Sequence, residues 1–552
     1  MMKKRLFLCA LGMICHTLAM GNTTPKHRRI DTQMAVYADV MRMLDVFYVD
    51  TLNYEHLTTT AIMATVSELD PYTVYVPKEN KEDLRMMTTG EYGGIGSVIT
   101  QRGDSIIISE PYEGMPAQRA GLKAGDILLK VDGVAVKGKT VSQVSDMLRG
   151  VPHEVIRLSV KRPNVKKVLN FEFERETIHI QSIAYYGCIA PKVGYVLLND
   201  FTEHAATDFK KAVQDMVKRD SISSLVIDLR GNGGGLIDEA VKIVSYFTPR
   251  GTQVVSVKGK HPSAERVYKT LTDPFFPDMK LAVLVNNSSA SASEIVAGAF
   301  QDLDRGVLLG TRTFGKGLVQ NIRTVGSDGG NLKLTTGKYY IPSGRCIQAI
   351  DYTHRNEDGS VGAIPDSLTK EFKTKAGRTV RDGGGVTPDV LLKEREDINI
   401  AYHLFMQHIF FDFATNYEQQ HASILAPDSF VITEDLFNDF EKYVQERKFS
   451  YTTHTEKYLK ELHEWAEFEG LDSLVITEFA ALEAKLKPNV AEELKRHRED
   501  VEMLLADEII KRYFYKKGMV QYRVRKDKDI LKTVEILLDE KQYKDILSAK
   551  KK

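Results

Sequence analysis

Two short apolar segments each run into a turn and then a helix, and this pattern constrains the fold more than any other. Residues 225–227 precede a helix expected over 237–247, and residues 281–285 precede one expected over about 293–301. Apolar runs without polar alternation are typical of strands buried on both faces of a parallel sheet. The stretch from about 180 to 345 is therefore predicted to be an α/β domain.

The rest of the 552-residue chain shows other patterns, so we expect a multidomain α+β protein. Apolar residues at helical spacing predict a helical N-terminal region over 28–83. Short β runs between glycines predict a mostly-β domain over 84–175, inserted before an α/β core over 176–394. A charged helical region is expected over 395–552.

The composition argues against disorder and against a nucleic-acid partner. Hydrophobic residues make up 43% and charged residues 27% of the chain, as in ordinary globular proteins. Lys and Arg together number 75, and so do Asp and Glu, which leaves no basic excess for a nucleic-acid backbone.

The N-terminus has the features of a secretory signal. Residues 1–5 are basic and residues 6–20 are mostly apolar, with small residues near position 21. The apolar run of about 15 residues is shorter than the roughly 20 that span a bilayer. We therefore predict a signal peptide at 1–21 and an exported protein, with the periplasm as the expected compartment.

Four cysteines occur in the chain, and Cys9 and Cys15 would leave with the signal peptide. Cys188 and Cys346 remain, and the sequence leaves open whether they pair. Because they lack C-x-x-C spacing, two free buried thiols are the simpler interpretation. We expect neither a metal site nor a cofactor.

Ser291 follows the apolar strand at 281–285 within a run of small residues. A serine at a strand-to-helix corner can expose its hydroxyl, while the first amides of the helix face developing negative charge. Ala290 and Ala292 leave room for a substrate backbone. Plain helix capping would use the same residue types, and that alternative stays open.

Lys316 lies 25 residues after Ser291, between two glycines and among apolar residues. Burial would lower its pKa from ~10.4 and leave a neutral amine that accepts the serine proton. Gln320 could orient that amine, although a flat strand would place the two side chains ~13 Å apart, so a bend at the glycines is required. The alternative is a solvated surface lysine.

A glycine-rich stretch, DLRGNGGG at 228–235, directly follows the strand at 225–227. Glycines let backbone amides approach a ligand closely, so these amides and that of Ala292 could form an oxyanion hole. A tight strand-to-helix turn would explain the same glycines.

Taken together, these elements resemble the carboxyl-terminal processing (tail-specific) protease family. That family has D-L-R-x-N-x-G-G, S-A-S-A-S-E, T-x-G-K-G-x-x-Q, K-L-T-T-x-x-Y-x-x-P-S-G and G-x-x-P-D in this order. The matching stretches here are 228–235, 289–294, 313–320, 333–344 and 385–389. The resemblance covers roughly residues 30 to 390.

The resemblance implies a crotonase/Clp-like core and a serine endopeptidase that forms an acyl-enzyme and needs no cofactor. Ser291 would be the nucleophile, Lys316 the general base and Gln320 its orienting partner, with Gly234 and Ala292 as oxyanion donors. Its partners would be proteins or peptides with free C-termini. The chain departs from the family in two loops. About 35 residues separate Gln348 from Gly385, and the pair at 287–288 stands where a glycine is usual.

The stretch Gly93-Gly94-Ile95-Gly96 is similar to the carboxylate-binding loop of PDZ domains. The amides of Gly94, Ile95 and Gly96 would form a nest for a peptide's C-terminal carboxylate. Residues 133–140 formally match G-x-x-x-x-G-K-T, but β-branched residues at 134 and 136 stiffen this loop, and it lies inside the PDZ pattern. We therefore expect no nucleotide site.

Two other readings remain open. One is an exported PDZ scaffold with a silent core, against which the intact Ser291, Lys316 and Gln320 argue. The other is an adaptor or homo-oligomer that associates through the C-terminal helical region, where residues 490–515 have apolar side chains at helical spacing. The sequence lacks H-E-x-x-H, K-T-G and S-D-N, which argues against zinc proteases and penicillin-binding enzymes.

Overall fold

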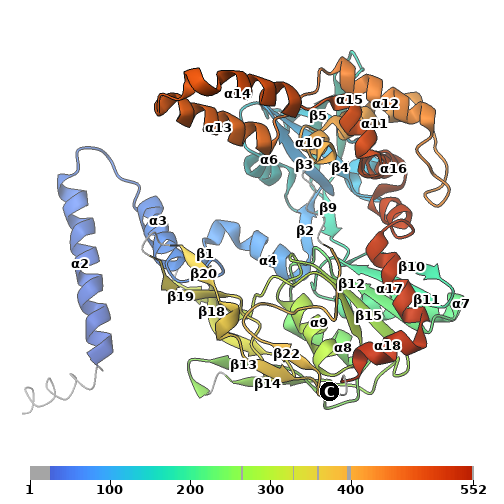
Figure 1. The fold of residues 1–552 in the computed structure, drawn as a ribbon. Helices are drawn as coiled ribbons and strands as arrows, with labels where there is room; N and C mark the ends of the chain where they lie inside the picture. Colours follow the sequence, from blue (N-terminus) through green and yellow to red (C-terminus); the bar gives the residue numbers. More distant parts are fainter. Residues whose placement is uncertain (1–24, 263–264, 327–328, 357–359, 394–398, 550–552) are drawn as a thin grey trace, which may run out of the picture. The chain divides into compact units, whose positions relative to one another are not determined.

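The computed structural model describes residues 25–262, 265–326, 329–356, 360–393 and 399–549 (Figure 1). Two compact units divide the chain, one ending at Glu68 and one beginning at Leu69. The predicted signal peptide at 1–21, with Cys9 and Cys15, lies outside the described residues. Among the described helices, none is long and apolar enough to cross a membrane.

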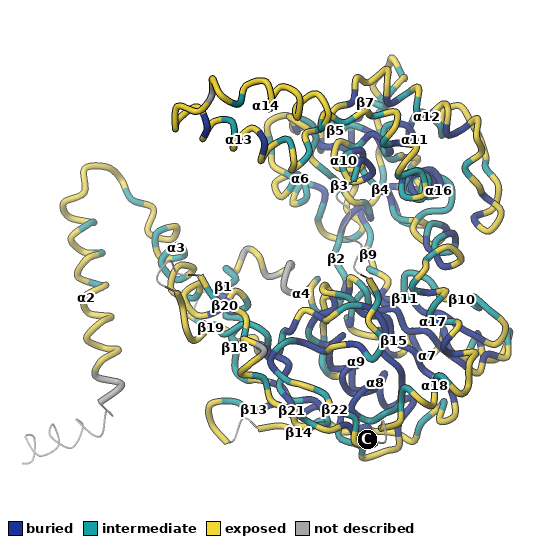
Figure 2. The backbone as a smooth tube through the Cα atoms, in the orientation of Figure 1, coloured by how far each residue is buried: buried dark blue, intermediate teal, exposed yellow. Residues whose placement is uncertain are grey.

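The described part of the first unit, from residue 25 on, contains two helices, α2 (Pro25–Phe47) and α3 (Tyr54–Ser67). Most of α2 is exposed (Figure 2), including its apolar residues Ile30, Met34 and Val40. The stretch predicted as one helical region, 28–83, is thus divided in the structure. Residues 69–83 belong to the second unit and include strand β1 (Val74–Val76).

Six strands form the central sheet of the second unit in the order β10-β11-β12-β15-β16-β23. Their bounds are β10 Ile183–Ala190, β11 Val193–Leu198, β12 Ser224–Asp228, β15 Lys280–Val285, β16 Val307–Gly310 and β23 Val390–Leu391. Strand β10 is antiparallel to β11, and all other neighbours are parallel. The two predicted apolar strands lie side by side, with Leu225 opposite Leu281.

Helices cover both faces of this sheet because its side chains alternate between two apolar clusters. Leu225 and Ile227 pack into a cluster with α7 (Ala205–Asp220), α8 (Ile237–Ser245) and α9 (Ala292–Asp302). Val226, between them, packs into a second cluster with the last two helices of the chain, α17 (Lys528–Leu538) and α18 (Glu540–Leu547). Figure 1 shows these two helices in red beside the sheet. The C-terminal end of the chain is therefore part of the core domain's packing.

A second, antiparallel sheet carries the segment after Lys316. Its strands are β1, β18 (Gly330–Tyr340), β13 (Gln253–Gly259) and β14 (Arg266–Lys269), with β17 (Leu318–Val325) paired to β18. The 351–384 segment, expected to be a loop or insertion, forms two small hairpins. These are β19 (Ile350–Arg355) with β20 (Val361–Ala363), and β21 (Glu371–Lys373) with β22 (Thr379–Arg381).

An antiparallel sheet with two helices forms the inserted mostly-β domain. Its strands are β3 Ser97–Arg102, β4 Ser105–Pro111, β5 Ile127–Val131, β6 Val134–Ala135, β7 Val155–Lys161 and β8 Leu169–Glu174, and its helices are α5 Pro116–Arg119 and α6 Val141–Leu148. Helix α4 (Lys81–Thr89) precedes it, and the paired strands β2 (Glu91–Gly94) and β9 (Glu176–His179) flank it. Ile108, Val144 and Ile156 lie at its apolar centre.

Seven further helices lie between the core and α17. They are α10 Ile400–Met406, α11 Ile409–Gln420, α12 Glu434–Glu446, α13 His454–Phe468, α14 Asp472–Leu486, α15 Val490–Arg496 and α16 Arg498–Arg523. Phe410, Phe440 and Ile509 belong to their shared apolar cluster. Tyr515 has a φ of +54° and interrupts the helical geometry of α16.

Candidate active site

Ser291 stands at the corner between β15 and α9, where the sequence predicted a strand-to-helix turn. Its φ of +57° and ψ of −114° are rarely adopted by an L-residue, so the surrounding turn imposes this conformation. The side chain is half-buried. Ala292 is the first residue of α9, so its amide has no acceptor within the helix and lies at the positive end of the helix dipole.

Hydrogen bonds fasten this turn to the glycine-rich loop at 228–235. The Ser289 hydroxyl donates to the Leu229 carbonyl at 2.7 Å, and the Ala290 amide donates to the Asn232 carbonyl at 3.0 Å. The Ser293 hydroxyl donates to the same Asn232 carbonyl at 2.9 Å. The two segments that were expected to act together are therefore held as one body.

The Glu294 carboxylate joins the turn at Ser291 to the loop that carries Lys316. Its Oε2 accepts hydrogen bonds from the backbone amides of Ser291 at 2.8 Å and Lys316 at 2.9 Å. Its Oε1 accepts from the Thr313 hydroxyl at 2.6 Å and the Gly315 amide at 2.7 Å. Burial raises the pKa of Glu294 to about 7, while these four hydrogen bonds favour its charged form.

The Tyr339 hydroxyl makes a second connection between the same two residues. It donates to the backbone carbonyls of Ser291, at 3.2 Å, and of Lys316. Tyr339 is buried in β18, and burial raises the pKa of its hydroxyl well above the ordinary value, so it stays a donor. Both backbone polar groups of Ser291 and of Lys316 are thus held by side chains.

Lys316 occupies the loop before β17, and its side chain is half-buried. Burial, and next the positive charge of Lys333, lower the pKa of Lys316 to about 8, although Glu294 and Asp70 oppose the shift. The Lys316 Nζ lies 4.3 Å from the centre of the Tyr72 ring. A lysine in this environment is part neutral near neutral pH, as a general base requires.

Gln320 lies in β17 just after a break in the pairing register between Val319 and Gln320. Its side-chain amide donates to the Thr335 hydroxyl at 3.1 Å, and that hydroxyl contacts Asp70 Oδ1 at 3.2 Å. Gly315, whose φ is +86°, bends the chain before Lys316, whereas the register break lies between Lys316 and Gln320. The described hydrogen bond of Gln320 therefore goes to Thr335, and its orienting role toward Lys316 stays a prediction.

Gly234 packs directly against the turn at Ser291. A Cβ at this position would lie 2.8 Å from Ser291 Cβ and 2.9 Å from the Ala292 nitrogen, and its φ is +103°, so only glycine fits. Its amide donates to Asn232 Oδ1 at 2.8 Å. That bond would have to break or be shared if the amide served an oxyanion, and the donor roles of Gly234 and Ala292 stay predictions.

Comparison with known protein families gives three matches. The model for "Peptidase family S41" matches residues 192–355, and the model for "PDZ domain" matches residues 107–162. A third model, "Probable PDZ-protease, C-terminal helical domain", matches residues 400–537.

Among curated proteins, the chain is 34% identical over 359 residues to "Carboxy-terminal-processing protease" of Bartonella bacilliformis, covering 64% of this chain and 82% of that one. This chain belongs to peptidase family S41. The peptidase is also 36% identical over 313 residues to "Probable CtpA-like serine protease" of Staphylococcus aureus, covering 56% of this chain and 61% of the relative. Among solved structures, it is similar to "Photosystem II D1 C-terminal processing protease", with 28% identity, a TM-score of 0.37, and coverage of 63% of this chain and 84% of that one.

Three predictions are confirmed by these matches. The family resemblance holds, the fold is an S41 core with a PDZ domain and a C-terminal helical domain, and the protein is a serine-type peptidase.

The PDZ loop predicted to bind a carboxylate connects β2 to β3. Gly94 pairs with Glu176, and the Ile95 carbonyl accepts from the Ala117 amide at 2.9 Å. Gly96 has a φ of +70°, and its carbonyl accepts from the Tyr112 amide at 2.9 Å. The loop is therefore anchored through its carbonyls, while peptide binding by its amides stays a prediction.

The formal phosphate-loop match at 133–140 is a β-hairpin followed by a helix start. Val134 and Ala135 form β6, paired to β5. Thr140 caps α6 by accepting from the Gln143 amide at 3.3 Å, while the Gln143 side chain accepts from the Thr140 amide at 2.9 Å. The Thr140 hydroxyl is used as a helix cap here.

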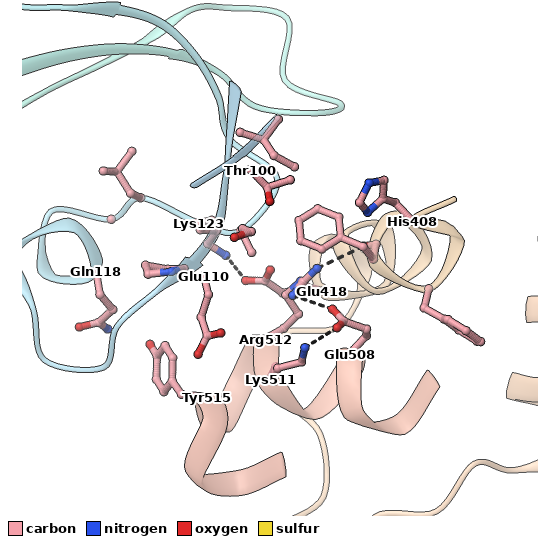
Figure 3. Close-up of a pocket in the computed structure, with 18 of the residues that line it drawn as sticks. Thr100, Glu110, Gln118, Lys123, His408, Glu418, Glu508, Lys511, Arg512 and Tyr515 are labelled. Carbon is pink, nitrogen blue, oxygen red and sulfur yellow. Dashed lines mark hydrogen bonds and ion pairs between the residues drawn. The ribbon is translucent and has the colours of Figure 1, made fainter. Parts of the chain in front are cut away.

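The PDZ domain rests on helices α11 and α16 of the peptidase, with a cavity of about 350 Å³ between them (Figure 3). Arg102 binds Asp412 with two hydrogen bonds, of 2.5 and 3.0 Å. Lys123 binds Glu418 at 2.7 Å, as Figure 3 shows. This cavity is lined by β4 and α16, on elements other than those that carry Ser291 and Lys316.

Four residues of the site had no role assigned from the sequence: Glu294, Tyr339, Asp70 and Tyr72. Glu294 and Tyr339 lie inside family motifs, so the motifs mark their positions, although the spacing alone does not tell which backbone groups they bind. Asp70 and Tyr72 lie in the 28–83 stretch, which was predicted only as a helical region with no functional residue. Cys188 and Cys346 are both free and half-buried, which answers the pairing question left open.

Proposed function

We propose that this S41 peptidase is an exported endopeptidase with Ser291 as nucleophile and Lys316 as general base. The observation that carries the proposal is that the Glu294 carboxylate and the Tyr339 hydroxyl each bind the backbone of both residues. A dyad needs its two members held in one geometry, and two independent connections provide that.

The reaction follows from these roles. The Ser291 oxygen bonds to the scissile carbonyl carbon while its proton moves to the neutral Lys316 amine. The carbon–nitrogen bond then breaks, and Lys316 returns the proton to the leaving amine. Water attacks the resulting ester with Lys316 again accepting a proton, the bond to Ser291 breaks, and the serine hydroxyl is restored.

The first amide of α9, that of Ala292, supports an oxyanion at the tetrahedral carbon, with Gly234 as the second proposed donor. Gln320 is proposed to act on Lys316 indirectly: it donates to Thr335, Thr335 donates to Asp70, and the charge of Asp70 acts on the Lys316 amine. Apart from the substrate and the attacking water, these steps use only groups of the chain itself.

The PDZ domain, proposed over 84–175 beside a core over 176–394, would select substrates by their C-terminal tails through Gly94, Ile95 and Gly96. Export rests on residues 1–21, and the periplasm is the proposed compartment. Removing those residues should retain the protein in the cytoplasm, which cell fractionation measures.

Cleavage of an unfolded reporter with an apolar C-terminal tail tests the dyad. Ser291→Ala and Lys316→Ala should each lower kcat/KM by at least a thousandfold while the proteins stay folded. Ser288→Ala and Lys338→Ala, matched changes at exposed positions, should keep the wild-type rate. A slow ester substrate should add its acyl mass to the wild type and not to Ser291→Ala. If the Lys316→Ala variant cleaved the reporter at the wild-type rate, the assignment of Lys316 as the base would be overturned.

A further inference from the structure

The Lys316 amine faces an aromatic ring that comes from outside the family's catalytic motifs. Its Nζ lies 4.3 Å from the centre of the Tyr72 ring, a distance typical of a cation held over an aromatic face. Within the described part of the chain, the Lys316 amine forms neither a hydrogen bond nor an ion pair. The ring is therefore a described contact of the proposed general base.

A buried turn fixes the backbone of Tyr72. Asp70 is 7% exposed, and its Oδ1 accepts from the amides of Tyr72 and Thr73, both at 2.8 Å. The Thr335 hydroxyl of β18 contacts the same oxygen at 3.2 Å, and the Thr335 amide donates to the Thr73 hydroxyl at 3.2 Å. The turn is thus attached to the strand pair that carries Gln320.

The 351–384 insertion supports the ring of Tyr72 from a second side. Tyr352, on β19, meets Tyr72 edge to face, with ring centres 6.0 Å apart and planes at 90°. The two hydroxyls are 3.4 Å apart. Asp70 and Tyr352, the two residues that support Tyr72, also line a cavity of about 440 Å³. The insertion, which departs from the family's usual spacing, therefore contacts Tyr72 through Tyr352, and Tyr72 in turn contacts the proposed base Lys316.

We propose that Tyr72, supported by Tyr352 of the insertion, is a positioning residue that covers the Lys316 amine and keeps water from it. The inference deepens the proposed function and rests on Lys316 being the general base.

The charges around Lys316 show why such a cover matters. Lys333 on β18 disfavours the ammonium form, whereas Glu294 on α9 and Asp70 favour it. Burial is the largest cause of the lowered pKa, and the Tyr72 ring is part of what buries the amine. Opening this side to water removes part of the desolvation and leaves two carboxylates to hold the proton on the amine, and we expect this to outweigh the lost attraction between the ring and an ammonium.

Tyr72→Ala tests the inference through a pH profile of kcat/KM. Loss of the ring should raise the pKa of the base, so activity at pH 7 should fall about tenfold and recover above about pH 9.5. Tyr72→Phe keeps the ring and should keep the acid limb where the wild type has it. Tyr352→Ala should also shift the acid limb to higher pH, by less than Tyr72→Ala does. Tyr186→Ala, at an exposed tyrosine of β10, is the matched control for loss of a tyrosine.

The outcomes separate the two proposals. If Tyr72→Ala lowered kcat/KM equally at every pH, or left the pH profile unchanged, the positioning role of Tyr72 would be overturned. The role of Lys316 as base would still stand if Lys316→Ala were inactive. Activity in Lys316→Ala would overturn the base itself. Circular dichroism and thermal unfolding show whether the Tyr72→Ala variant is folded. If it is not folded, Tyr72→Phe provides the test. A shifted acid limb in Tyr72→Phe would also contradict the inference.

Discussion

Ser291 and Lys316 share one carboxylate oxygen: the backbone amides of both residues donate to Oε2 of Glu294, at 2.8 and 2.9 Å. The two residues are 25 positions apart in sequence, and the segment between them includes helix α9 and strand β16. Glu294 is fully buried and uses all its acceptor capacity on four donors. It therefore sets the backbone geometry of both proposed catalytic residues without contacting substrate.

Glu294→Gln should lower kcat/KM by roughly 10- to 100-fold. The new amide group would face either two backbone N–H groups or a hydroxyl and an N–H, all of them donors, and each unsatisfied buried donor costs about 1–3 kcal/mol. Steady-state cleavage and thermal unfolding measure the effect. Glu265→Gln, at an exposed position before β14, is the matched control. Activity within threefold of wild type would show that Glu294 does not set the geometry.

On the acid side of the pH profile, activity should fall more steeply than the ionisation of a single group would make it fall. Lys316 must be neutral and its pKa is about 8, while Glu294 must be charged and its pKa is about 7. The slope of log kcat/KM against pH should therefore be about 1 between pH 7 and 8 and approach 2 below pH 7. A slope of 1 down to pH 5 would contradict the role of the Glu294 charge.

The stability of the fold should fall with rising pH because of Glu294, whereas the activity should rise. Its pKa in the folded state is raised above the unfolded value of about 4.3, so the native state binds more protons between those values. The free energy of unfolding should then fall as pH rises from about 4.3 to 7 through this group. Urea unfolding of wild type and Glu294→Gln across that range isolates the contribution, which should be absent in the variant.

Lys333→Met should raise the pKa of Lys316, because a neighbouring positive charge that disfavours the ammonium is removed. The acid limb of kcat/KM should move up by roughly half a pH unit, with about a threefold loss at pH 7. Lys338→Met, on the exposed side of the same strand, should leave the limb in place. Equal profiles for the two variants would rule out the electrostatic effect of Lys333.

The local parts of this site were predictable from the sequence. Uninterrupted apolar runs identified β12 and β15, and the small residues after β15 indicated the corner at Ser291, because burial and turn chemistry are local signals. The glycine at 234 was marked by its motif, and the structure adds the reason, which is its contact with Ser291.

Contacts across long sequence distances were not predictable in the same way. The turn at 69–73 carries no signal that its tyrosine reaches Lys316, since that contact depends on how β1 pairs with β18. The apolar periodicity of α17 predicts a helix with one buried face, but it does not tell which surface that face covers. Gln320 shows the same limit, because a register break in β17 decides where its side chain points.

Gly234→Ala should lower kcat/KM by at least 100-fold. The added Cβ would lie 2.7 Å from the Ala290 carbonyl oxygen and 2.8 Å from Ser291 Cβ, so the nucleophile's turn must shift. Gly251→Ala is the matched control, because Gly251 also has a positive φ, of +82°, but has open space around it. Both variants should lose about 1–3 kcal/mol of stability from backbone strain, while only Gly234→Ala should lose activity. Similar kinetics for the two would mean that the contact with Ser291 is unimportant.

The last prediction concerns α17, which links the helical domain to the core sheet. Leu537 is 1% exposed and packs in the cluster that includes Val226, whereas its neighbour Leu538 is 58% exposed. Leu537→Ala should lower the free energy of unfolding by about 2–5 kcal/mol through loss of buried apolar contact and a residual cavity, and Leu538→Ala by less than about 0.5 kcal/mol.

The two leucines are adjacent in one helix, so helix propensity is nearly the same for both changes and the difference reports packing against the sheet. Urea unfolding followed by circular dichroism, in parallel with cleavage of the reporter, measures both quantities. Loss of the protease activity of Leu537→Ala at the same urea concentration as its unfolding would show that α17 and the core unfold together. Equal stability of the two variants would instead mean that the core sheet is stable without this helix, and that the C-terminal region is a separable domain.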